Sequence, residues 1–274
     1  MTIVNMLIII GYSALFLLVY LILAFIVGTI KKNNGIMDIF YGPGYSIVAL
    51  TSIIYYFVIN NSVNVRQIIV TVLVIIWSIR LASYVFIRNR GKPEDYRYKA
   101  MRKRWKTNIV LKSLIRVYIF QGIVIFIVAF PVWFVNISPN PVLMNLLDFI
   151  GITLWIGIII WLIGFLFETF GDYQLYKFKQ DPNNKGTVLD QGLWKYTQHP
   201  NYFGEVTQWW GIYIIALAVP FGFISIFGPI FITYMIIKVS GIKLLDKHYE
   251  GDDIYADYKR RTSLFFPWFP KKKK

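Results

Sequence analysis

The 274-residue chain contains no cysteine and only two histidines, His199 and His248. The absence of cysteine excludes disulfides, thiolate metal sites and cysteine nucleophiles. Two histidines are too few for an ordinary histidine-based zinc site, so we expect no metal. The sequence also lacks a Gly-rich P-loop and a Rossmann fingerprint, so any nucleotide must be held by a different arrangement.

Long apolar runs dominate the chain, which is 57% hydrophobic. A helix needs ~20 mostly apolar residues to cross a bilayer. The first run is no cleaved signal peptide, because it lacks a basic start and a cleavage site. The sequence therefore predicts one all-α domain over residues 1–274, a polytopic bundle of seven transmembrane helices. The predicted spans are residues 3–29, 41–59, 67–87, 111–135, 143–167, 202–219 and 221–239.

Acidic residues are scarce, with 14 Asp and Glu against 29 Lys and Arg, and the bases are unevenly placed. They concentrate in residues 88–112, 177–195 and 238–274, whereas the connectors 136–141 and around Pro220 carry no charge. Basic loops remain cytoplasmic. We therefore expect a multi-pass protein of a bacterial cell membrane, or of the endoplasmic reticulum in a eukaryote. Its N-terminus lies outside, its C-terminus is cytoplasmic, and its expected partners are membrane lipids and no nucleic acid.

The segment GLWKYTQHPNYFGEVTQWWG, residues 192–211, places polar side chains at the start of a predicted span. Pro200 marks the first turn of a helix, whose N-terminus carries partial positive charge and free N–H groups. Asn201, Glu205 and Trp209 recur every four residues and share one helix face. Because an ionisable group in a membrane helix is costly, Glu205 indicates a ligand site.

The fifth predicted span ends in a second polar stripe. Glu168 and Asp172 are one helical turn apart, and Lys179 lies two turns beyond Asp172. Such acids accept hydrogen bonds from a sugar or an amide, and the lysine can meet a phosphate. The alternative is a solvated helix end with an acid–base pair.

Further polar residues lie nearer the N-terminus. Asp38 opens the second span, either capping that helix or facing a substrate. Arg80, Tyr84 and Arg88 recur every four residues and share a face of the third span. The sequence Asn89-Arg90-Gly91-Lys92-Pro93 places two bases on a constrained backbone at the membrane, which suits a phosphate. Residues 102–106 are typical of a membrane-surface segment.

The C-terminal tail, residues 243–274, is basic and amphipathic. It either lies on the membrane face and covers the site, or acts as a peripheral anchor.

Several motifs together resemble those of the DUF1295 membrane-protein family, a branch of the steroid 5-alpha-reductase superfamily. The resemblance covers roughly residues 35–270 and is densest over residues 168–211. Its motifs in this sequence are Asp38-x-x-x-Gly42, Asn89-Arg90-Gly91-Lys92, Asp172-Tyr173-Gln174-Leu175-x-x-Phe178, Gly192-Leu193-Trp194-x-Tyr196-Thr197-x-His199-Pro200-Asn201-Tyr202-Phe203-Gly204-Glu205, Trp209-Trp210-Gly211 and Tyr258-x-x-Arg261-Thr262-Ser263-x-Phe265-x-Pro267-Trp268. Gln198 departs from the pattern, because the family usually has Arg there.

The resemblance implies a seven-span enzyme that holds NADPH in a cytoplasmic cavity of the bundle. Asp172, Lys179 and Asn201 match cofactor positions, and Lys92 matches a base at the adenosine phosphate. Glu168 stands where the steroid enzymes have Asn. The residues expected at the cofactor are Arg90, Lys92, Glu168, Asp172, Lys179, His199, Asn201, Tyr202, Tyr258 and Arg261.

The catalytic residues expected from the resemblance are Asp38, Tyr84 and Glu205. Glu205 matches a position near the nicotinamide, and Asp38 replaces the acid of the steroid enzymes' substrate pair. The tyrosine of that pair is matched by Ser78, with Tyr84 almost two turns further on.

The implied activity is NADPH-dependent reduction of an activated C=C bond in a lipid, isoprenoid or steroid-like enone, a hydrophobic small molecule. Protonated Asp38, Tyr84 and Tyr41 are the candidate donors to the carbonyl oxygen. Two alternatives remain. One is S-adenosylmethionine-dependent methyl transfer to a lipid or prenylated substrate, because isoprenylcysteine methyltransferases share an HPxY element. The other is a non-enzymatic lipid-binding protein.

Overall fold

A computed structural model describes residues 3–138 and 149–271. These residues form helices joined by turns, and no strand occurs among them. The chain divides into two compact units, which are described separately. The first contains Met1–Leu154 and Ile215–Gly228, and the second contains Trp155–Ile214 and Pro229–Lys274. The predicted all-α class is confirmed over the described residues.

Six segments of the described chain are long and apolar enough to cross a membrane, as expected of a multi-pass integral membrane protein. They are Leu7–Ile30, Ile36–Asn60, Val65–Asn89, Ile109–Val128, Gly151–Gln180 and Gly222–Asp246. The predicted sixth span, residues 202–219, forms the 17-residue helix α9 (Pro200–Ala216) and is not among the six. Part of the predicted fifth span and of the 136–141 connector lies outside the described residues.

The fourth predicted span is not one continuous helix. It consists of α5 (Ile109–Ser113), the π-helical turn η1 (Leu114–Ile119), α6 (Phe120–Val128) and α7 (Phe130–Ile137). The chain bends at Ala129, where ψ is 0°. Pro131 follows at the start of α7, where its missing N–H costs least.

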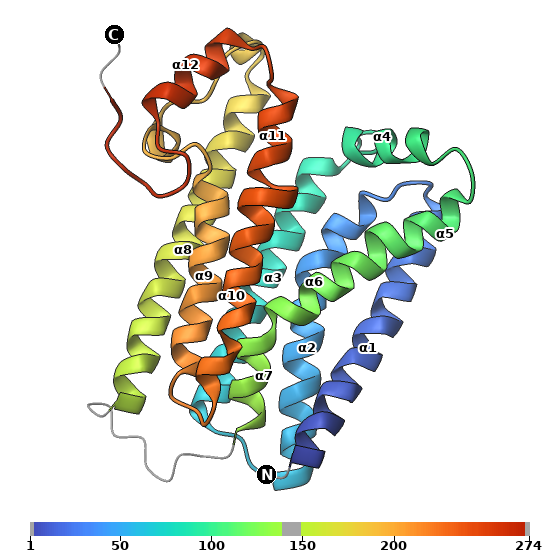
Figure 1. The fold of residues 1–274 in the computed structure, drawn as a ribbon, viewed down its shortest axis with the longest axis vertical. Coiled ribbons are helices and arrows are strands. Elements are labelled where there is room, and N and C mark those ends of the chain that lie inside the picture. Colours follow the sequence, from blue (N-terminus) through green and yellow to red (C-terminus); the bar gives the residue numbers. More distant parts are fainter. Residues whose placement is uncertain (1–2, 139–148, 272–274) are drawn as a thin grey trace. The chain divides into compact units, whose positions relative to one another are not determined.

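In the first unit, α1 (Ile3–Ile30), α2 (Ile36–Asn60) and α3 (Val65–Asn89) run side by side (Figure 1). Helix α2 continues through Pro43 and packs closely at its glycines. A Cβ on Gly44 would lie 2.7 Å from Ile125 Cδ1 of α6, and one on Gly42 would lie 3.0 Å from the Ser78 carbonyl of α3. Small residues at such points let membrane helices approach each other.

Buried hydrogen bonds reinforce this packing. The Asn136 amide of α7 donates to the Ala49 carbonyl and the Ser52 hydroxyl of α2 at 3.1 and 2.9 Å. The Gln67 amide of α3 donates to the Asn136 carbonyl at 2.8 Å. These bonds connect α2, α3 and α7 and satisfy polar groups that the packing buries.

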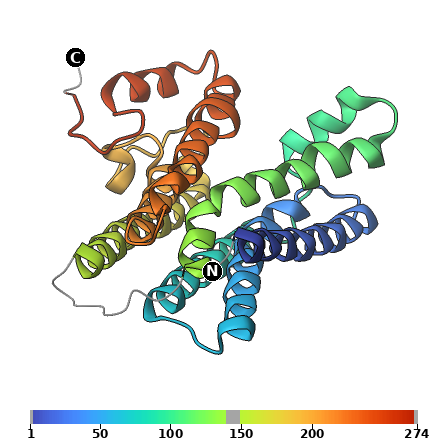
Figure 2. The same ribbon diagram turned by 60° about the horizontal axis from the view of Figure 1, so that its bottom comes forward.

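In the second unit, α8 (Phe149–Gln180) pairs with α9, and α10 (Phe227–Tyr234), η5 (Met235–Ser240) and α11 (Ile242–His248) follow (Figure 1). The Trp210 indole of α9 donates to the Thr233 hydroxyl of α10 at 3.3 Å. The last helix, α12 (Asp253–Arg261), is capped by the Asp252 carboxylate. Figure 2 shows α12 and the segment after it beside the loop that precedes α9.

Candidate functional site

The contact between α8 and α9 depends on glycines seven residues apart. A Cβ on Gly164 would lie 2.6 Å from the Gly204 carbonyl, and one on Gly211 would lie 2.7 Å from the Gly157 carbonyl. Gly171 similarly faces the Pro200 ring and the Asn201 amide at the start of α9. The two helices are therefore antiparallel and almost in backbone contact, which brings their polar stripes together.

Asp172 and Asn201 meet at one end of this contact. The Asn201 amide donates to the Asp172 carboxylate at 3.1 Å, and its carbonyl oxygen accepts from the Tyr202 backbone amide at 3.0 Å. The two bonds determine the orientation of the Asn201 side chain. Asp172 is 4% exposed and Asn201 is half-buried, so the two predicted cofactor residues meet in a partly buried polar contact. Its role stays a prediction.

Glu168 lies one turn along α8 and meets a residue that the sequence analysis missed. The Gln208 amide donates to the Glu168 carboxylate at 2.6 Å, and both side chains are buried. Gln208 Oε1 is buried and accepts no hydrogen bond from the described residues. The seven-residue spacing of the glycines was the available signal, because it places Gln208 on the face of α9 that meets α8.

The stripe formed by Glu168, Asp172 and Asn201 is thus part of a packed interface rather than a solvated helix end. Its carboxylates accept hydrogen bonds, and the nearby Gln208 Oε1 has the capacity to accept one. Such a set suits a ligand that presents hydroxyl or amide donors. Lys179, predicted to meet a phosphate, is exposed near the end of the same helix.

The loop that precedes α9 is held in place by α8. Gly192 has a φ of +59°, which favours glycine, and the Leu193 amide donates to the Gln174 side chain at 3.0 Å. The Trp194 indole donates to the Gly171 carbonyl at 3.1 Å. These contacts determine where α9 begins, and the predicted helix start at Pro200 is confirmed.

His199 is 2% exposed, and its ring stacks on that of Tyr202 with centroids 5.5 Å apart. Its Nε2 has no hydrogen-bond partner among the described residues. Burial lowers the pKa of His199 to about 4, so the imidazole is neutral near pH 7. In a neutral imidazole, Nε2 donates a hydrogen bond in one tautomer and accepts one in the other. Nε2 of His199 could therefore bind a donor or an acceptor of a ligand.

The C-terminal segment attaches to the loop before α9 through residues predicted at the cofactor. The Tyr258 hydroxyl donates to the Trp194 carbonyl at 2.6 Å. Arg261 pairs with Asp257 at 2.9 Å and lies 3.6 Å from Asp190. Gln198, which replaces the family's usual Arg, donates to the Thr262 carbonyl at 2.7 Å. These contacts give Tyr258, Arg261 and Gln198 roles in holding the loop.

Glu205 lies one turn after Asn201 in α9 and is half-buried, on the stripe that the sequence predicted. Its expected position near a nicotinamide stays a prediction.

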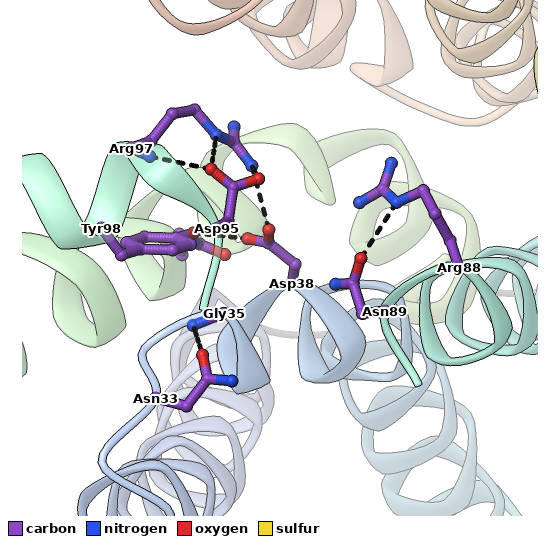
Figure 3. A network of polar contacts seen from close by, with 9 residues as sticks. Asn33, Gly35, Asp38, Arg88, Asn89, Asp95, Arg97 and Tyr98 are labelled. Atoms are coloured by element: carbon purple, nitrogen blue, oxygen red, sulfur yellow. Dashed lines mark hydrogen bonds and ion pairs between the residues drawn. The ribbon is translucent and has the colours of Figure 1, made fainter. Parts of the chain in front are cut away.

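The first unit contains a second polar cluster, centred on Asp38 in the first turn of α2 (Figure 3). Its carboxylate accepts from Arg97 at 3.1 Å and, through its other oxygen, from the Tyr98 hydroxyl. The Gln121 amide of α6 donates to the same hydroxyl at 3.2 Å. At the start of α2 the Gly35 amide donates to the Asn33 side chain at 2.8 Å, while the Asp38 carboxylate binds α4 (Tyr96–Trp105).

Helix α4 is held against the turn between α1 and α2 through Glu94 and Arg102, and its own first turn is stabilised by Asp95. Asp95 binds Arg97 through both of its oxygens at 3.0 and 3.1 Å. Glu94 pairs with Arg102 and also accepts from the Asn34 backbone amide at 2.7 Å. The sequence analysis assigned no role to Glu94, whose contact with Asn34 spans 60 residues of the chain.

Electrostatics keep Tyr98 protonated and Arg97 charged. Burial, reinforced by the nearby Asp38 carboxylate, raises the pKa of Tyr98 well above its ordinary value. Burial alone lowers the pKa of Arg97, but its bonds to Asp95 and the Asp38 charge outweigh this and raise it. Tyr98 is therefore a permanent hydrogen-bond donor to Asp38.

The other first-unit candidates lie around the end of α3. The guanidinium carbons of Arg80 and Arg88 lie 5.7 and 5.4 Å from the centre of the Tyr84 ring, which confirms their shared face. Arg90 and Lys92 are exposed in the turn after α3, where Gly91 has a φ of +72°. Their predicted phosphate contact stays a prediction.

Comparison with known proteins shows the family to which the chain belongs. The model of the family described as "Protein of unknown function (DUF1295)" matches residues 24–262, which is most of the chain. The chain therefore belongs to the DUF1295 family, as its motifs predicted.

Two Schizosaccharomyces pombe proteins are similar to parts of the chain. Uncharacterized protein C594.04c is 24% identical over 255 residues, covering 84% of this chain and 67% of that protein. Uncharacterized protein C9.08c is 35% identical over 77 residues, covering 23% of this chain and 27% of that protein. The chain thus spans about two thirds of one relative and about a quarter of the other. No solved structure matches it.

Proposed function

We propose that this member of the DUF1295 family is a membrane reductase that uses NADPH to reduce an activated C=C bond. Its substrate would be a hydrophobic lipid, isoprenoid or steroid-like enone. The observation that carries the proposal is the hydrogen bond between buried Asp172 of α8 and half-buried Asn201 of α9. These two residues match cofactor positions in the resemblance to steroid 5-alpha-reductases. The proposal includes no metal and no nucleic acid.

The residues of the second unit fit the groups that NADPH presents. Ribose hydroxyls and a carboxamide need acceptors, which Asp172, Glu168 and the free Gln208 Oε1 offer. When bound, NADPH would supply a hydride to the β carbon of the enone. Asn201, oriented by Asp172 and by the Tyr202 amide, would position the carboxamide end. Glu205, on the same face of α9, would lie near the ring.

Reduction of an enone also needs a hydrogen-bond donor to the carbonyl oxygen, where negative charge develops. Among the candidate donors named from the sequence, Asp38 accepts hydrogen bonds from two side chains of α4, Arg97 and Tyr98. Tyr98 stays protonated and donates to Asp38, and Arg97 keeps a positive charge beside it. Both bonds are accepted by the Asp38 carboxylate, so Asp38 would have to take up a proton before it could donate to a carbonyl oxygen, and Tyr84 and Tyr41 are the alternative donors.

Direct titration of the purified protein tests this function. We expect NADPH or NADH to bind, as detected by calorimetry, and S-adenosylmethionine not to bind. Binding of S-adenosylmethionine alone would replace the proposal with methyl transfer. Binding of none of the three would favour a lipid-binding protein without cofactor chemistry.

We further propose that α9 is a seventh span, with the N-terminus outside and the C-terminus cytoplasmic. The helix has 17 residues, about 26 Å at 1.5 Å per residue, near the lower limit for a span. It pairs antiparallel with α8 from Gly171 to Gly157, inside the Gly151–Gln180 span. Basic residues 177–195 then lie on the cytoplasmic side.

The absence of native cysteine makes this topology testable with single introduced cysteines. We expect an impermeant maleimide to label Asn61→Cys and Phe223→Cys in intact cells, and Lys185→Cys only after permeabilisation. All three positions are exposed. Labelling of Phe223→Cys and Lys185→Cys from the same side would show that α9 does not cross the membrane. Labelling of Asn61→Cys from the cytoplasm would reverse the orientation.

A further inference from the structure

The C-terminal segment, residues 264–271, exposes a row of large apolar side chains. Phe266 and Trp268 are each 71% exposed, Phe269 is 78% exposed and Leu264 is 43% exposed. Single exposed apolar residues are common, but a contiguous group of aromatics marks a surface that contacts something.

This segment is not a loose tail, because its backbone is bound to the loop before α9. The Gln198 backbone amide donates to the Ser263 carbonyl at 2.9 Å. The Trp268 backbone amide donates to the Tyr196 carbonyl at 2.9 Å. The Thr197 hydroxyl donates to the Phe265 carbonyl at 2.8 Å, and the Phe265 side chain is buried. The exposed rings are thus presented by an ordered backbone.

The loop that holds this segment is bound to the last third of α8, where the exposed side chains change from apolar to basic. Trp194, two residues before Tyr196, is bound to the Gly171 carbonyl of α8. Around that level the side chains of α8 change character, from exposed Phe170 and Tyr173 to exposed Lys177. An aromatic-to-lysine change of this kind is typical of the boundary between acyl chains and headgroups.

We propose that residues 264–271 form a lipid anchor at the bilayer interface, in which Phe266, Trp268 and Phe269 enter the headgroup–acyl boundary. Exposed Lys195 and Lys271 supply positive charge for anionic headgroups. The anchor would hold the loop before α9, and with it His199 and Pro200, against the membrane. This inference does not depend on the identity of the cofactor.

Single-cysteine labelling tests the anchor in the full chain. The variants are Trp268→Cys and Phe269→Cys, with Lys185→Cys, in an exposed turn of the same unit, as the matched control. Each is labelled with an environment-sensitive fluorophore and reconstituted into nanodiscs. The discs contain zwitterionic lipid with or without anionic lipid, and a nitroxide at acyl position 5 or position 12.

We expect the probes at 268 and 269 to be blue-shifted and quenched at least twofold more by the position-5 nitroxide than by the position-12 nitroxide. Anionic lipid should increase this quenching, while the probe at 185 stays unquenched. Emission at 268 and 269 equal to that at 185 would overturn the proposal. A blue shift without quenching would also overturn it, because protein rather than lipid would then cover the rings.

Discussion

Replacing Asp172 with Ala is expected to weaken NADPH binding by about 10- to 150-fold. The loss corresponds to ~1.5–3 kcal/mol, the value of a hydrogen bond to a charged group. Asp172 is buried and holds the Asn201 amide, so its removal takes away an acceptor for the cofactor and also releases Asn201. Titration of each purified variant with NADPH, followed by calorimetry, measures the effect.

Three further variants show whether the effect belongs to the Asp172–Asn201 contact. Asp172→Asn, which keeps shape but not charge, should lose less affinity than Asp172→Ala. Asn201→Ala should weaken binding, and the double variant should lose less than the sum, because the two side chains bind each other. Asp181→Ala, an exposed carboxylate beyond α8, should bind like the parent. If Asp172→Ala and Asn201→Ala both bind NADPH with parental affinity while remaining folded, the cofactor lies elsewhere.

Replacing Gly204 with Ala is expected to produce a large loss of stability. The new Cβ would overlap the Glu168 backbone amide and lie 2.5 Å from the Gly164 carbonyl. Neither contact can be relieved by a side-chain rotation, so α8 and α9 must move apart and separate Glu168 from Gln208. Overpacking of this kind costs ~3 kcal/mol. Thermal unfolding in detergent should begin well below the parental temperature.

Gly11→Ala is the matched control for this substitution. Gly11 also lies inside a predicted membrane helix, α1, and a Cβ there would meet no atom within 4 Å. Alanine at that site should leave the unfolding temperature unchanged or slightly higher, because alanine favours helix. If the Gly204→Ala protein unfolds at the same temperature as the parent, the close backbone contact between α8 and α9 is contradicted.

Much of the candidate site could be predicted because it follows helical periodicity. Glu168 and Asp172 share a face of any helix through them, as do Asn201 and Glu205, whatever the helix packs against. Helix α8 does continue to Gln180, and α9 does begin at Pro200. The partners across the interface, such as Gln208, could not be read in the same way, because a single helix does not specify which face another helix covers.

The surroundings of Asp38 show the limit of local reasoning. Its position suggested a helix cap, but its carboxylate binds Arg97 and Tyr98. Those residues are 59 and 60 positions away, on a short polar helix with no apolar periodicity to reveal which side it presents. Only the folding of α4 back onto the α1–α2 turn brings them together, through Glu94 and Arg102.

By itself the sequence determined that the protein is helical and crosses a membrane several times, because a long apolar run without charges is stable only as a spanning helix. It also indicated the family, through motifs over roughly residues 35–270, and the family model matches residues 24–262. The tertiary structure alone decided three features: the break at Ala129, the backbone contact at Gly204 and the binding of residues 264–271 to the loop before α9. The last two depend on atoms far apart in the chain, where no residue's own propensity specifies the partner.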